Sequence, residues 1–232
     1  MEMIWLGLSK AIHMLISLDR EVLAVTWLTL KISGTATVLS VVLGVPVGAF
    51  LALANFPGRK LVVSIVNFGM GLPPVVVGLW VSIFLWRNGP FGFLRLMYTP
   101  TAIVMAQAVI AAPIVTGFAI AAIQQVNPKI SLQIRALGAS SWQFLWYLLR
   151  EARYGLMAAV MAGFGGVISE VGASMMVGGN IKGETRVLTT ATMMEVSKGN
   201  FDIAIALSII LLMLAYLITL ALTVIQQQRS TS

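Results

Sequence analysis

Five long apolar stretches constrain this chain more than any other feature. Each is longer than the roughly 18 residues that mark a candidate membrane span. They are continuous rather than alternating, which is not the pattern of barrel strands. In chain order they cover residues 27–54, 61–86, 101–123, 154–177 and 203–225. The sequence therefore predicts an all-α polytopic membrane bundle with five spans.

The composition agrees with this fold class and excludes several functions. The chain is 59% hydrophobic and 10% charged, whereas soluble domains contain about 25% charged residues. It has no cysteine, which excludes thiol nucleophiles and thiolate metal sites. The net charge of +7 comes from basic residues scattered over loops, so we expect no nucleic-acid partner. The chain has one histidine, His13, and no nucleophile or zinc-ligand motif, so we expect no catalysis.

The two ends of the chain differ from its centre. Residues 1–21 have mixed polarity and predict an interfacial amphipathic helix, with a short sixth span as the alternative. No small-residue cleavage pattern follows them, so we expect no cleaved signal peptide. Residues 22–226 form the predicted membrane domain, and residues 227–232 form a polar tail. With the C-terminus placed inside, seven Lys and Arg side chains lie in inner segments and seven in outer ones, so charge leaves the orientation open.

Residues 124–153 form a polar interruption between two apolar stretches. They predict two short helices hinged at Gly138 and Ala139, with Ser140 or Ser141 as the N-cap of the second helix. From the residues alone, the segment is either an amphipathic helix on the lipid headgroups or a docking element for a partner protein.

The same segment, "ALGASSWQFLWYLLREAR", resembles the cytoplasmic coupling loop of ABC importer permeases. Gly138 matches the glycine of that signature, whereas Leu132-Gln133-Ile134 replaces its Glu-Ala-Ala and Arg150 replaces its proline. "TLKISGTATVLSVVLGVPVGAFLA", "GLPPVVVGL" and "GVISEVGASMMVGGNIKGETRVLTTA" resemble segments of the molybdate, tungstate and sulfate permeases. The chain is most similar to the tungstate type, over residues 22–226.

The resemblance implies a type I ABC importer permease fold and a non-catalytic subunit that carries a tetrahedral oxyanion, above all tungstate, by alternating access. It implies a second copy of the chain, two ATP-binding cassette subunits and an extracytoplasmic oxyanion-binding protein as partners. The chain itself would hold no cofactor, because ATP would bind the partner ATPase. The expected location is the cytoplasmic membrane of a bacterium or archaeon, with the N-terminus outside and the C-terminus inside. Molybdate and sulfate permeases are alternatives within the family, and an anion channel or secondary transporter is the alternative outside it.

Two groups of residues follow as site candidates. We expect the hinge of residues 124–153 to dock on the ATPase, and we expect the translocation pathway or gate to use a proline pair and small residues. The coupling candidates are Arg135, Ala136, Leu137, Gly138, Ala139, Ser140 and Trp142. The pathway candidates are Gly71, Pro73, Pro74, Gly165, Gly166, Glu170 and Gly172.

Glu170 is the single acidic residue within an expected span, and such a charge is a functional candidate by default. Lys31 is the one basic residue deep enough to pair with it. A Lys31–Glu170 ion pair is one interpretation. In the other, Lys31 extends outward to water while Glu170 binds backbone or hydroxyl groups. In the outer loop, Lys182 and Arg186 are candidates for attracting an anion.

Overall fold

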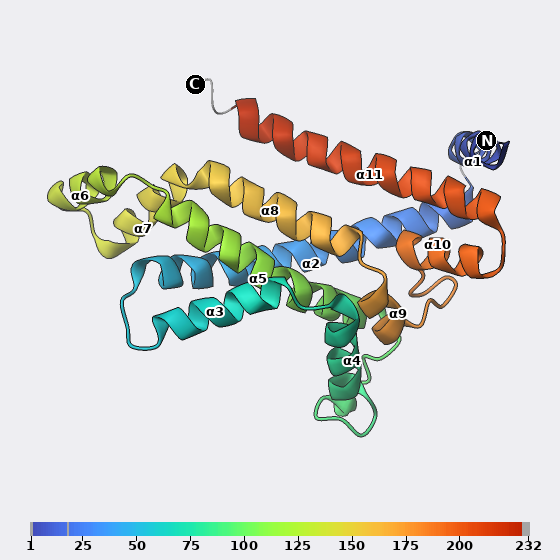
Figure 1. The fold of residues 1–232 in the computed structure, drawn as a ribbon, viewed down its shortest axis with the longest axis horizontal. Helices are drawn as coiled ribbons and strands as arrows, with labels where there is room; N and C mark the ends of the chain where they lie inside the picture. Colours follow the sequence, from blue (N-terminus) through green and yellow to red (C-terminus); the bar gives the residue numbers. More distant parts are fainter. Residues whose placement is uncertain (1, 18, 229–232) are drawn as a thin grey trace.

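The computed structural model describes residues 2–17 and 19–228, and these form a bundle of helices (Figure 1). The last four residues of the expected polar tail lie outside this description, and residues 227 and 228 continue the last helix. The helices are α1 Glu2–Ile16, α2 Arg20–Leu53, α3 Arg59–Met70, α4 Pro74–Leu85, the 3-10 turn η1 Gly92–Leu94, α5 Pro100–Gln124, α6 Pro128–Ala136, α7 Ser141–Glu151, α8 Arg153–Ile168, α9 Gly172–Gly178, α10 Leu188–Ser197 and α11 Phe201–Gln228.

Three helices, α2, α5 and α11, are by themselves long and apolar enough to cross a membrane. Two further candidates are bent pairs: α3 and α4 meet at 102°, and α8 and α9 meet at 59°. The five expected spans therefore correspond to three continuous helices and two bent pairs, if each pair crosses once. The fourth expected span was predicted without a break, and that detail is wrong because the chain turns at residues 169–171.

The centre of the bundle is the contact between α2 and α5. Small residues allow these helices to approach closely, as membrane helices require. A Cβ atom on Gly48 would lie 2.7 Å from the Cβ of Ala119, and one on Gly44 would lie 3.0 Å from a methyl group of Val115. The buried Ser40 hydroxyl donates a hydrogen bond to the carbonyl of Ala108, 3.2 Å away. The Gly44 and Gly48 spacing thus serves packing within the chain.

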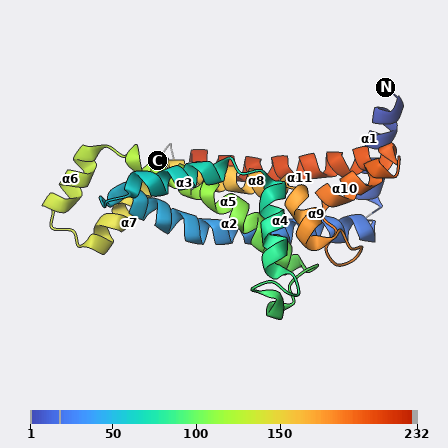
Figure 2. The same cartoon turned by 60° about the horizontal axis from the view of Figure 1, so that its bottom comes forward.

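The bundle has two distinct ends (Figure 1). One, which we call the α7 end, carries α6, α7 and the turn between α2 and α3. The other, the α10 end, carries α1, α10 and the start of α11. α1 is tied to α11 there, because Lys10 forms a 2.5 Å ion pair with Asp202. α4 and η1 project sideways from the bundle, which Figure 2 shows from a second direction.

Candidate functional site

The first element of the candidate site is the break between α3 and α4. Pro73 has extended backbone angles and Pro74 occupies the first turn of α4, where a missing N–H group costs nothing. Because neither proline can donate to a helical hydrogen bond, the span must stop and restart at this point. Gly71 ends α3 as its C-cap. The predicted break is confirmed, and its 102° angle turns α4 almost perpendicular to α3.

The second element is the break between α8 and α9, which is organised by Glu170. The Glu170 side chain is buried, and its carboxylate accepts hydrogen bonds from the backbone N–H groups of Ala173 at 2.9 Å and Ser174 at 3.0 Å. The Ser174 hydroxyl donates a third bond at 3.2 Å. A negative charge is favourable at the N-terminus of a helix, where N–H groups lack partners. Glu170 therefore starts α9 and explains a break that contains no proline.

The two breaks pack directly on each other. A Cβ atom on Gly172 would lie 2.5 Å from the Cγ2 atom of Val75, the residue after the proline pair. One turn further, a Cβ on Gly78 would lie 2.5 Å from the Cα of Ala173. Real Cβ atoms do not approach other atoms so closely, so a side chain at Gly172 would displace the Val75 methyl group and one at Gly78 would displace the backbone of Ala173. Gly71, Pro73, Pro74, Glu170 and Gly172 are thus gathered in one place, where two interrupted spans meet.

Buried polar side chains connect this place to the neighbouring helices. Gln107 of α5 donates from its Nε2 atom to the Ser174 hydroxyl at 3.3 Å, and its Oε1 atom has no partner within the described residues. Thr189 of α10 donates to the backbone carbonyl of Glu170 at 3.0 Å. Thr29 of α2 accepts from the N–H group of Leu188 at 2.9 Å. The sequence reasoning missed Gln107 and Thr189. For Gln107, the signal in the sequence was a glutamine within an apolar stretch.

Three candidates lie elsewhere. The carboxylate of Glu170 bonds backbone and hydroxyl groups, while Lys31 is exposed, and no ion pair joins the two within the described chain. This arrangement corresponds to the second of the two interpretations, in which Glu170 binds backbone and hydroxyl groups and Lys31 extends outward. Gly165 is exposed with nothing within 4 Å of an added Cβ, and Gly166 faces the Cδ1 atom of Ile114 at 3.3 Å. Their carbonyls accept hydrogen bonds from the Ser169 hydroxyl at the end of α8, at 2.9 and 3.4 Å, but an added Cβ on either glycine would not meet the α3–α4 break.

The coupling candidates form a separate unit at the α7 end. α6 stops at Leu137, and Gly138 has φ +77°, a left-handed conformation that glycine adopts without steric cost. Ser140 then caps α7 by accepting from the N–H group of Gln143, while the Gln143 side chain accepts from the N–H group of Ser140. This reciprocal capping box confirms the predicted hinge and the first of its two predicted N-caps.

The unit has a packed side and an exposed side. Phe144 and Leu148 are buried against α2 and α5, and the guanidinium of Arg135 lies 4.5 Å from the centre of the Phe144 ring. By contrast, Leu137 is 87% exposed and Trp142 is 74% exposed. Large apolar side chains held at this exposure on a packed base are suited to contact another protein or lipid.

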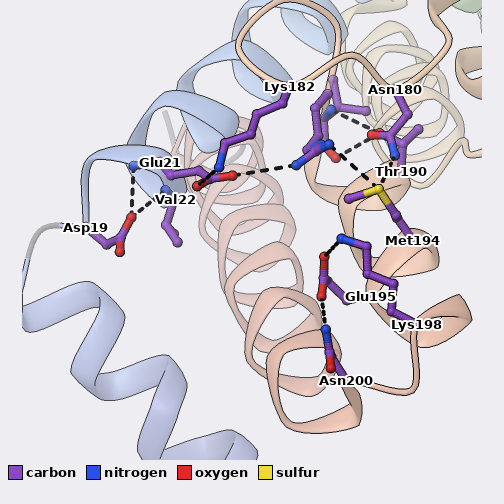
Figure 3. A network of polar contacts seen from close by, with 12 residues as sticks. Asp19, Glu21, Val22, Asn180, Lys182, Thr190, Met194, Glu195, Lys198 and Asn200 are labelled. Carbon is purple, nitrogen blue, oxygen red and sulfur yellow. Dashed lines mark hydrogen bonds and ion pairs between the residues drawn. The ribbon is translucent and has the colours of Figure 1, made fainter.

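At the α10 end, a network of polar contacts ties α2 to the loop after α9 (Figure 3). Glu21 forms ion pairs with Lys182 at 2.6 Å and with Arg186 at 3.6 Å. The two cations expected to attract an anion are therefore paired with a carboxylate of the chain itself. Nearby, the Glu195 carboxylate accepts from Asn200 at 2.7 Å and from Lys198 at 2.8 Å. The hydrogen bond from Asn200, followed by that from Lys198, lowers the pKa of Glu195.

Comparison with known proteins shows which family and which relatives this chain resembles. Residues 44–231 match the family described as the binding-protein-dependent transport system inner membrane component. The tungstate uptake system permease protein of Peptoclostridium acidaminophilum is 38% identical over 98% of this chain and 100% of that protein. A probable anion ABC transporter permease protein of Haloferax volcanii is 39% identical over 82% of this chain and 84% of that protein.

Solved structures agree with the fold. An inward-facing MetNI methionine ABC transporter has a TM-score of 0.77 at 23% identity, covering 91% of this chain and 97% of that one. The expected type I importer permease fold is confirmed. From the matched family and its full-length relatives, the chain belongs to the inner membrane components of binding-protein-dependent transport systems and is a membrane permease subunit.

Proposed function

We propose that this chain is the membrane subunit of an ATP-driven importer for a tetrahedral oxyanion, with tungstate as the substrate. The observation that carries the proposal is the match over the whole length of a tungstate uptake permease, 38% identical. A second tungstate uptake permease, from Campylobacter jejuni, is 32% identical over 90% of this chain. The sulfate and molybdenum permeases are less similar, at 27–29% identity.

The exposed side of the α6–α7 unit supports docking on an ATPase. Interface energy concentrates in a few large side chains that enter pockets on the partner, and Leu137 and Trp142 have this character. Phe144 and Leu148 anchor the same unit in the bundle, so a displacement of the hinge by the ATPase would also displace α2 and α5. The proposal places the α7 end in the cytoplasm, the N-terminus outside and the C-terminus inside. ATP would bind and be hydrolysed on the partner.

The packed breaks support a gate that the substrate passes. Broken spans in transporters place backbone groups next to the pathway. In this chain Glu170 already binds the N–H groups of Ala173 and Ser174 in the first turn of α9, so those two groups are not free for an anion. We assign Glu170 to holding the break in shape rather than to binding the oxyanion, which its charge would repel. A second copy of the chain would complete the pathway, and an extracytoplasmic binding protein would deliver the substrate.

The direct test is uptake of labelled oxyanions into vesicles that contain this chain together with its partner ATPase and binding protein. We expect ATP-dependent tungstate uptake that is lost without either partner. Preferential uptake of molybdate or sulfate would assign the chain to the corresponding relatives and refute tungstate. Uptake by the chain alone, without ATP, would instead support a channel or secondary transporter.

The orientation has its own test. The chain has no native cysteine, so a single engineered cysteine is the only thiol in the chain. Leu137→Cys and Lys182→Cys lie at opposite ends of the bundle. In intact cells, an impermeant maleimide should label the second variant and not the first. Labelling of Leu137→Cys alone would reverse the proposed orientation.

A further inference from the structure

An open apolar groove runs between α2, α8 and α11 near the α7 end. It has a volume of about 450 Å³. Its walls include Val42 and Val45 of α2, Met157 and Val160 of α8, and Ile225 of α11. These side chains are only partly buried or exposed, so the groove opens onto the surface of the bundle.

The path of α11 creates this groove. α11 packs on α1 and α10 at its start, and Figure 1 shows it leaving α2 and α8 as it runs toward the C-terminus. Near the far end, Gln226 donates from Nε2 to the backbone carbonyl of Tyr154 at 3.0 Å. This side-chain bond links the end of α11 to the start of α8, so the hollow between the helices ends at a polar contact.

Arg153 stands at that polar end. Its Nη2 atom donates to the Tyr154 hydroxyl at 3.1 Å, and its guanidinium carbon lies 4.8 Å from the centre of the Tyr154 ring. Arg153 is exposed and forms no ion pair with a carboxylate in the described part of the chain. A guanidinium has five N–H donors in a planar fork, so most of its donors are left for an outside acceptor such as a phosphate.

We propose that the groove binds one anionic phospholipid, with an acyl chain between α2, α8 and α11 and the phosphate on Arg153. The shape and the chemistry both lead to this occupant, because the site is apolar along its length and cationic at one end. Acyl chains fill any such hollow in a bilayer, since an empty one would lose dispersion contacts. Selection among lipids must therefore come from Arg153. Only the choice of leaflet, the inner one, rests on the orientation in the proposed function.

A free oxyanion and a second copy of the chain fit the groove less well. A tetrahedral dianion has no apolar part to fill the hollow between Val45 and Val160, and at an exposed arginine it would compete with water. An apolar helix of a partner copy would fill the hollow but leave Arg153 without an anion. Basic pockets between membrane helices on the cytoplasmic side are known sites for anionic headgroups.

The test is native mass spectrometry of the purified importer with phosphatidylglycerol or phosphatidylcholine added in equal amounts. One basic residue near the membrane surface strengthens the binding of an anionic lipid roughly fivefold. We expect about that preference for phosphatidylglycerol in the unchanged protein and near equality in Arg153→Ala. Arg150→Ala is the matched control, because it removes the same charge from an exposed position three residues away that does not line the groove. It should keep the preference.

Filling the hollow gives a second measurement. Val160→Trp should lower the occupancy of both lipids, whereas Val38→Trp, at an exposed position of α2 outside the groove, should not. The lipid proposal is wrong if Arg150→Ala and Arg153→Ala act alike, or if the unchanged protein does not distinguish the two lipids. It is also wrong if a photo-crosslinker at Met157 captures a second copy of the chain instead of lipid. Oxyanion uptake is not read in these experiments, so their failure leaves the proposed transport function intact.

Discussion

Removing the Glu170 carboxylate should destabilise the protein by an amount that the hydrogen bonds define. In Glu170→Ala, the buried N–H groups of Ala173 and Ser174 lose their acceptor. Each unsatisfied buried donor costs about 1–3 kcal/mol, so the free energy of unfolding should fall by roughly 2–6 kcal/mol. Glu170→Gln keeps one acceptor oxygen and turns an NH₂ group toward the other donor. It should therefore cost about half as much.

The assay is equilibrium unfolding in mixed micelles, followed by the fluorescence of the six tryptophans. Lys31→Ala is the control, because Lys31 is exposed and unpaired within the described residues, and a surface change should stay within about 0.5 kcal/mol. Equal losses in Lys31→Ala and Glu170→Ala, abolished in a charge-swapped double variant, would show that the two side chains pair after all. If Glu170→Ala leaves the free energy of unfolding unchanged, the role of this carboxylate in starting α9 is refuted.

Three further outcomes can be measured. Gly78→Ala should destabilise the protein by about 1–3 kcal/mol because the added Cβ would meet Ala173. Gly165→Ala, with open space around the added Cβ, should leave stability unchanged or raise it slightly. The midpoints of thermal unfolding of the two variants measure this difference. Leu137→Ala should leave those midpoints unchanged but weaken co-purification of the ATPase, since the side chain is 87% exposed. The pKa of Glu195 is lower in the folded protein than in the unfolded chain. The ionised Glu195 therefore stabilises the fold at pH values above its unfolded pKa, and this stabilisation is lost as the pH falls through its folded pKa. Asn200→Ala should therefore reduce stability at neutral pH and have less effect in acid, and an effect independent of pH would contradict the assignment.

The sequence predicted features that depend on neighbouring residues. The proline pair predicted a break because proline lacks the N–H group that a helix needs at any depth. The hinge at Gly138 and the cap at Ser140 follow from local turn and capping preferences, and both occur in the structure.

Features that depend on distant residues were predicted less well. The break at Glu170 was missed because an acidic residue in an apolar stretch suggests a distant cation, whereas its partners are backbone groups three and four residues ahead. Small residues at Gly165 and Gly172 look alike in the sequence. Only the fold shows that Gly172 meets Val75 and Gly165 meets nothing. The side on which a helix packs is set by elements far away in the chain.

The close contact between α2 and α5 also has a consequence for synthesis. The two helices touch through Gly44, Gly48 and Ala119, yet the 46 residues 54–99, which contain the bent pair α3–α4 and its loop, separate them in the chain. Chains emerge N-terminus first at about 5–20 residues per second. The glycine face of α2 therefore enters the bilayer before its partner exists and faces lipid until α5 is inserted. A nascent chain that stops before Pro100 should leave this face exposed to lipid. Such a chain is a candidate substrate for membrane quality control.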